Sequence, residues 1–367
     1  MKQIILYCIL IPVLLLNGCS DQINIEDVTL TLILGLDLDE NDNLKVYLSS
    51  PIFNEEAKIK EEHYGVKSIT VRDSREKFDT MVMGLTSASK TQIILVGKRL
   101  LQQKNWADYL DPFYRDPLNT NTARIVAVDG PVSDIIYYGP KNKPRLPIYL
   151  KKLIDTAHQR NAIAKTTLQK FHNQTKEKGM TVSIPLIKKN KNLKLTGSVL
   201  LDEQNKYALA ISPEENALLS IIQNNIRGQL LFTLAVPVRR DNTDKNWLSF
   251  MVEGIKVNTN VQYTNRFVFN TDIHMRIFIS ERLFPMSKNN TEPELEKKIK
   301  KQLNIKFKDL VKKIQNAQID PIGLGLYARA YAYPNWKPIQ NKWGSSLAKA
   351  DVNVKVHVKI TAMGTTK

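Results

Sequence analysis

In the first half of the chain, short apolar runs are separated by polar residues that favour turns. Val28–Asp37 and Leu44–Ser50 are rich in apolar residues and flank the polar cluster Asp39–Asn43, a pattern that predicts a β-hairpin. Further strand-like runs then alternate with apolar residues spaced by three and four positions, as in helices. We expect strands at 66–71, 92–96, 123–128 and 180–187, and helices at 73–85, 106–113, 131–137, 147–154 and 162–171. Strands that alternate with short helices indicate an α/β or α+β module.

The second half of the chain contains longer strand-like runs. Ser212-Pro213-Glu214-Glu215 predicts a helix start, with Ser212 as the cap and acids in the first turn. Successive long strands without intervening helices favour an antiparallel sheet. We expect strands at 193–202, 206–211, 230–238, 250–261, 266–279 and 352–360. The last of these alternates strictly, which predicts one buried face.

A long basic helix is expected over residues 291–317. Thr291 and Glu294 fit a capping box, and apolar residues spaced by three or four positions form a narrow seam from Leu295 to Ile314. Lysines cover the remaining surface, at 297, 298, 300, 301, 306, 308, 312 and 313. Such a helix can lie on a membrane, or it can pack on a sheet with its lysines in solvent.

The first twenty residues have the pattern of an export signal. Lys2 precedes the apolar run Ile4–Leu16, which is too short to cross a bilayer comfortably, and Leu16-Asn17-Gly18-Cys19 follows. Leu-x-Gly-Cys is similar to a bacterial lipobox, in which the cysteine receives an S-diacylglycerol group and becomes the N-acylated first residue. Cys19 is therefore the predicted lipid attachment site. The alternative is an ordinary signal peptide with a cysteine near its cleavage point.

Cysteine content and charge change this picture in two ways. The only other cysteine, Cys8, lies in the leader, so the exported chain has no disulfide and no cysteine-based metal site or nucleophile. The net charge of +17 attracts polyanions, and export argues against nucleic acid, so we expect an anionic membrane surface as a partner. Part of the charge can equally be a solvated surface.

Motifs for catalysis or cofactor binding are almost absent. The five histidines are scattered, and no phosphate-binding glycine loop is present. Asp37-x-Asp39-x-Asn41 lacks the glycine and glutamate of a calcium loop and is interpreted as a hairpin turn. Ser346 and Lys349 match the loose S-x-x-K pattern of serine acyl-enzymes without its partner motifs. We expect no catalytic residues, no cofactor and no metal site, and hence a protein that is not an enzyme.

The chain resembles the Ger(x)C family, the lipoprotein C subunits of nutrient germinant receptors in spore-forming Firmicutes. The lipobox is followed by Ser20, where family members commonly carry tryptophan. The residues that carry the resemblance are Ile25–Val28, Gly35–Asp37, Val96–Lys98, Asp111–Asp116, Arg124–Val128, Asp320–Gly325, Trp336, Trp343 and Gly364. The order of basic helix, Gly-x-Gly, two tryptophans and a final strand is the most specific part.

This resemblance implies an α+β, multi-domain fold of three subdomains with mainly antiparallel β-sheets, each flanked by helices. The expected organisation is a lipoprotein signal peptide at 1–18, an N-terminal region at 19–190 with a possible break near 140–147, and a C-terminal domain at 191–367. The resemblance also implies a non-enzymatic receptor subunit on the outer face of the spore inner membrane. Its partners would be the membrane-embedded A and B subunits of the same receptor.

Two other functions stay open at this point. One is an exported lipoprotein that binds a small ligand for a membrane transporter. Such binders usually have repeated βαβ units, whereas the second half here is expected to be antiparallel. The other is an exported enzyme that uses Ser346 and Lys349.

Overall fold

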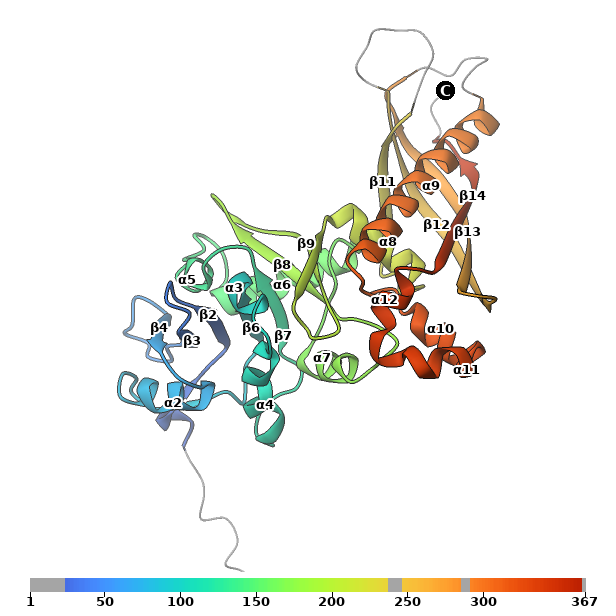
Figure 1. The fold of residues 1–367 in the computed structure, drawn as a ribbon. Coiled ribbons are helices and arrows are strands. Elements are labelled where there is room, and N and C mark those ends of the chain that lie inside the picture. The colour runs from blue at the N-terminus through green and yellow to red at the C-terminus, as the bar shows by residue number, and fades with distance from the viewer. Residues whose placement is uncertain (1–23, 237–245, 285–290, 365–367) are drawn as a thin grey trace, which may run out of the picture.

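A computed structural model of the chain describes residues 24–236, 246–284 and 291–364. The fold is α+β and contains two domains, which lie side by side (Figure 1). The first, the eight-stranded domain, covers residues 24–211, and the second, the four-stranded domain, covers the described residues from 212 onward. No helix in these ranges is both long and apolar enough to cross a membrane.

The eight-stranded domain is built on a mixed sheet. In spatial order its strands are β10 (Tyr207–Ile211), β9 (Leu193–Leu201), β8 (Ser183–Lys189), β7 (Arg124–Val128), β6 (Ile93–Gly97), β2 (Ile33–Leu38), β3 (Leu44–Pro51) and β4 (Glu61–Lys67). Its helices are η1 (Ile25–Asp27), α2 (Val71–Asp79), α3 (Lys98–Leu101), η2 (Trp106–Leu110), α4 (Asp111–Arg115), α5 (Val132–Ile136), α6 (Leu146–Gln159) and α7 (Leu168–Thr175). A separate two-stranded parallel ribbon pairs β1 (Val28–Leu30) with β5 (Leu85–Ser87).

The centre of this sheet is parallel, while its outer pairs are antiparallel, so the expectation of a mainly antiparallel α+β fold holds for most of its strand pairs. β2, β6, β7 and β8 run in parallel, and the pairs β2–β3, β3–β4, β8–β9 and β9–β10 are antiparallel. The helices between β6, β7 and β8 supply the crossovers that parallel neighbours require. Helices cover both faces, so a separate apolar core lies on each side of the sheet.

The four-stranded domain places its strands in the order β11 (Leu230–Ala235), β12 (Trp247–Tyr263), β13 (Phe267–Arg282) and β14 (Asp351–Ala362). The first three are antiparallel, as expected, but β14 pairs with β13 in parallel. The helices are α8 (Pro213–Ile222), α9 (Glu292–Asn316), α10 (Leu324–Tyr331), α11 (Tyr333–Trp336), η3 (Lys337–Lys342) and α12 (Trp343–Leu347). Figure 1 shows α9 running across one face of this sheet.

Helix α9 also protects the β14 edge of the second sheet. The side-chain oxygen of Asn304 accepts a hydrogen bond from the amide of Val356 at 3.0 Å. The Glu296 carboxylate accepts one from the amide of Ile360 at 2.8 Å. Edge amides that are already bonded cannot pair with a strand from another chain, so α9 blocks this edge at these two positions.

Several expected elements differ from the structure. The predicted helix at 162–171 begins only at Leu168, because Thr167 forms a β-bridge with Arg124. Thr70, rather than Asp73 or Ser74, caps α2. Thr291 is the N-cap residue of α9, but its side chain makes no capping hydrogen bond, so the predicted capping box is wrong there. The predicted cap at Ser212 is confirmed, and Glu215 completes a capping box with it.

The expected three subdomains are two in the structure, because β8, β9 and β10 complete the sheet that β2–β7 begin. A domain boundary at residue 190 would fall between β8 and β9, which are hydrogen-bonded neighbours. That boundary, and the break near 140–147, concern which segments fold independently, and both stay predictions.

Candidate functional site

The predicted lipid attachment site, Cys19, lies outside the described residues, as does Cys8. The hairpin interpretation of Asp37–Asn41 is confirmed, because Asp39 accepts hydrogen bonds from the amides of Asn41 and Asn43 in the turn between β2 and β3. The features that could serve function in the described ranges are the basic helix, the motif at Asp320–Gly325 and a pocket beside α2.

The apolar seam of helix α9 is buried inside the protein. Leu295, Ile299, Leu303, Phe307 and Ile314 are all buried in the core of the four-stranded domain. Because this face is covered by the sheet and α8, it is not available for insertion into a bilayer. The alternative in which α9 packs on the sheet with solvated lysines is the one that the structure has.

The outward face of α9 forms a lysine stripe, defined as Lys297, Lys301, Lys308 and Lys312. These four side chains are exposed and form no ion pair with another described residue. Lysines at the sides of the helix behave differently, since Lys306 and Lys313 pair with the first-turn acids of α8 at 2.9 and 2.5 Å. The stripe therefore carries uncompensated positive charge along several helical turns.

The motif at Asp320–Gly325 forms a buried polar node. The Asp320 carboxylate is fully buried and accepts hydrogen bonds from the amides of Gly323 and Gly325 and from Nε1 of Trp343, at 2.7, 2.8 and 2.7 Å. Burial raises the pKa of Asp320, and these donors act in the opposite direction. Gly323 turns the chain with a positive φ of 87°. The glycines thus serve a turn, as the sequence indicated.

The same node joins the two domains. The amide of Thr181, just before β8, donates to the carbonyl of Asp320 at 2.7 Å. Arg329 on α10 pairs with Glu177 at 2.7 Å. Gly179 and Gly325 pack so closely that a Cβ on Gly325 would lie 2.7 Å from the Cα of Gly179. We call these contacts the inter-domain seam, and they fix the four-stranded domain on the eight-stranded one.

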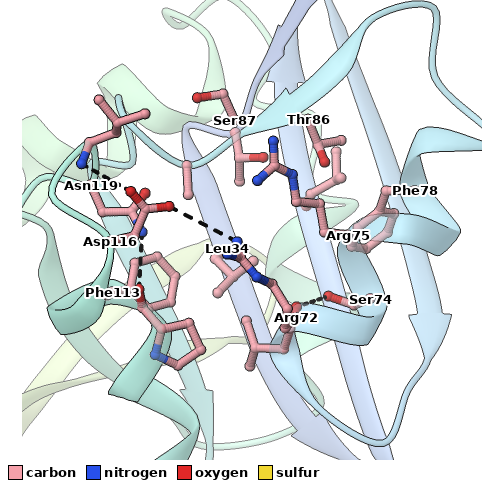
Figure 2. Close-up of a pocket in the computed structure, with 16 residues that line it drawn as sticks. Leu34, Arg72, Ser74, Arg75, Phe78, Thr86, Ser87, Phe113, Asp116 and Asn119 are labelled. Carbon is pink, nitrogen blue, oxygen red and sulfur yellow. Dashed lines mark hydrogen bonds and ion pairs between the residues drawn. The ribbon is translucent and has the colours of Figure 1, made fainter.

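A pocket opens between α2, β5 and α4 in the eight-stranded domain (Figure 2). We call it the α2 pocket, and its cavity volume is about 110 Å³. Apolar side chains from the sheet, α2 and α4 form its floor, namely Leu34, Leu48, Phe78 and Phe113. Its polar lining comes from Arg72, Ser74, Arg75, Thr86, Ser87, Asp116 and Asn119. It is the concave site in the described chain that best combines an apolar floor with charged groups.

Arginine dominates the charge of this pocket. Arg72 lies 4.0 Å from Asp116, the one carboxylate in the lining. Arg75 has no ion pair with any described residue, and Figure 2 shows it extending toward the wall formed by Thr86 and Ser87. The two arginines were not predicted as site residues from the sequence, although their separation by three positions places them on one helix face.

Comparison with known proteins decides the family. The model described as "Spore germination protein N-terminal domain" matches residues 21–189. The model described as "Spore germination B3/GerAC like, C-terminal" matches residues 196–364. The chain belongs to the GerAC-like family of spore germination proteins. The Asp320 node and Trp343 lie within the C-terminal match, and the α2 pocket lies within the N-terminal one.

Relatives within the GerAC-like family are similar along most of the chain. Spore germination protein GerQC of Bacillus cereus is 22% identical over 376 aligned positions that cover 100% of both chains. Spore germination protein B3 of Bacillus subtilis is 22% identical and covers 75% of this chain and 74% of its own. The crystal structure of the GerBC protein shares the fold, with a TM-score of 0.58 at 17% identity, over 89% of this chain and 96% of that one.

Among the described residues, no hydrogen bond joins the side chains of Ser346 and Lys349, the residues considered for catalysis. The Ser346 hydroxyl donates to the carbonyl of Lys342 at 3.4 Å, and Lys349 is exposed. The fold brings His274 and His357 together on β13 and β14, with stacked rings 4.4 Å apart, which the sequence did not indicate. In the described part of the chain, no group of three or more His, Cys, Asp or Glu residues could hold a metal ion.

Proposed function

We propose that this member of the GerAC-like family is a lipid-anchored, non-enzymatic subunit of a nutrient germinant receptor. The observation that carries the proposal is the pair of spore germination family models, which together match residues 21–189 and 196–364. The subunit would act in receptor assembly and in the response to germinants. Its location would be the outer face of the spore inner membrane.

The anchor in this proposal is Cys19. The leader of residues 1–18 would be removed, and Cys19 would carry an S-diacylglycerol group and an N-acyl chain. The described domains begin five residues after Cys19, at Asn24. A fully extended chain spans at most about 3.3–3.6 Å per residue, so the anchor would keep the eight-stranded domain close to the headgroups.

Partners in this proposal are the A and B subunits of the same receptor and the anionic membrane surface. The lysine stripe supports a charged contact, because its four cations are exposed and uncompensated among the described residues. The buried seam of α9 supports a contact made by charge without insertion.

The function is tested by replacing Cys19 with Ala in the chromosomal gene and following three readouts together. We expect the Cys19→Ala protein to lose lipid labelling, to leave the membrane fraction and to reduce nutrient germination strongly. The control for spore quality is germination by routes that do not use a nutrient receptor. It should be normal in the variant spores.

Cys8 provides the matched variant, because it is the only other cysteine and lies in the apolar core of the leader. Cys8→Ala should label, fractionate and germinate like the parent. If Cys19→Ala still incorporates lipid and remains in the membrane, the anchor assignment is wrong. If it leaves the membrane and germination is unchanged, the receptor role is wrong.

A further inference from the structure

We propose that the α2 pocket binds a small organic carboxylate with a short apolar tail. The pocket lies in the eight-stranded domain, away from the inter-domain seam and the lysine stripe. The inference rests on the pocket alone and holds whether or not Cys19 is lipidated.

The floor of the pocket suits an apolar group. Leu34, Leu48, Phe78 and Phe113 are each at most 6% exposed, and they come from four different elements of the domain core. Rigid core side chains give a preformed surface, so a ligand tail would be buried without reorganising the protein. Leu118, which is 77% exposed, stands at the rim and could cover the tail.

The mouth of the pocket suits an anion. The guanidinium groups of Arg72 and Arg75 line the pocket together with one carboxylate, that of Asp116. Its own loop also holds this carboxylate, which accepts a hydrogen bond from the Leu118 amide at 3.0 Å. The Arg72–Asp116 separation of 4.0 Å is long for an ion pair. One positive charge therefore remains uncompensated beside an apolar floor, and Arg75 carries it.

The hydroxyl groups that line the α2 pocket limit which headgroup of a ligand it can bind. The Ser74 hydroxyl donates to the carbonyl of Val71 at 2.7 Å, and the Thr86 hydroxyl donates to Asp79 at 2.7 Å. The donor protons of these two hydroxyls are used, and the arginines are the charged donors that a ligand would meet. A guanidinium matches a carboxylate with two parallel hydrogen bonds, and this geometry favours a planar carboxylate.

The volume of the cavity limits the length of the ligand's apolar tail. An engineered apolar protein cavity of about 150 Å³ accommodates benzene, so about 110 Å³ holds a tail of roughly four carbon atoms. Valerate fits this description, and valeramide is its neutral counterpart of nearly the same shape. For a ligand of this size we expect a dissociation constant on the order of 1 mM.

The test titrates the full-length chain in lipid nanodiscs with valerate and valeramide, using calorimetry and subtracting the signal of empty nanodiscs. We expect saturable binding of valerate and at least tenfold weaker binding of valeramide. Acetate has a shorter tail and should bind more weakly than valerate, because each buried methylene contributes about 0.8 kcal/mol, or roughly fourfold in affinity. Absence of saturable valerate binding, or equal affinity for valeramide, would overturn the proposal.

Variants identify the site. Arg75→Gln removes a side chain without an ion pair among the described residues, so the fold should be kept while valerate affinity falls about tenfold. The matched control is Arg227→Gln, an exposed arginine outside the pocket, which should bind like the parent. If Arg75→Gln binds valerate as tightly as the control, the ligand lies elsewhere and the assignment of this pocket is wrong.

Discussion

Asp73 holds the start of α2 and the loop before it. Its carboxylate accepts hydrogen bonds from the Ser68 hydroxyl at 2.7 Å and the Ile69 amide at 3.0 Å, and it pairs with Lys77 at 2.9 Å. The Ser68 hydroxyl, the Ile69 amide and Lys77 lower the pKa of Asp73 from 3.8 to about 2. The ionised form is thus the one that the folded chain stabilises.

This depressed pKa predicts a pH-dependent stability contribution. Between about pH 4 and 2 the unfolded chain binds the proton more readily than the folded one, so the contribution is present above this window and is lost as pH falls through it. Asp73→Asn should therefore destabilise the protein at pH 7, and its difference from the parent should shrink toward pH 2. Urea unfolding across this range measures the effect. Asp309→Asn, an exposed position on α9, is the control.

Local residue patterns were predictable where the partners are close in sequence. Ser212 and Glu215 bond each other's backbone across three positions, and the sequence alone indicated Ser212 as the cap and acids in the first turn. Asp320 and Trp343 were noted only as parts of a family motif. Their hydrogen bond, and the contact of Asp320 with Thr181, depend on segments that only the folded chain brings together.

At the scale of elements, the periodicity of α9 predicted its length and its buried seam, because one long helix presents the same face throughout. The segment 162–167 shows the opposite case. Its apolar spacing is helical, but the Ala164 amide donates to the Ser198 hydroxyl and the Thr166 hydroxyl donates to the carbonyl of Ser183. These contacts with β8 and β9 hold the segment extended, so tertiary bonding overrides the local preference.

The lysine stripe of α9 gives a prediction at the same scale. Replacing Lys297, Lys301, Lys308 and Lys312 with Gln should weaken binding to vesicles of anionic lipid at least tenfold, because each cation near the surface contributes about 1 kcal/mol. Flotation of the chain with phosphatidylglycerol vesicles at low salt measures this.

The control for the stripe removes the same charge elsewhere. Lys58, Lys90, Lys104 and Lys143 are exposed and lie in the eight-stranded domain, and their replacement with Gln tests whether position or total charge matters. Equal loss of vesicle binding in both fourfold variants would show that the stripe has no special part in it.

At the scale of the whole molecule, the inter-domain seam depends on two glycines. A Cβ on Gly179 would lie 2.9 Å from the backbone nitrogen of Leu326, so Gly179→Ala must push the domains apart at this point. We expect a loss of about 1–3 kcal/mol of stability. Hydrogen exchange should rise in residues 179–182 and 320–326, while β7 and the centre of α9 stay protected.

Gly139→Ala is the matched control, because a Cβ there would have no atom within 4 Å. Unchanged exchange at the seam in Gly179→Ala would mean that the close approach of the two glycines does not hold the domains in place.

The strand order of the first sheet is also a property of the whole molecule. The sequence predicted most of its strands, but the order in which β6, β7 and β8 join β2 depends on crossovers that periodicity does not encode.

The two edges of the second sheet differ. On β14, Asn304 and Glu296 already occupy two amides, so a strand is added there less readily. A β-sheet that continues through many copies requires an unblocked edge strand on both sides of the sheet in every copy. Because α9 occupies part of the β14 edge, end-to-end joining of sheets from neighbouring copies is disfavoured. Many copies of this chain can then lie close together without forming a continuous sheet.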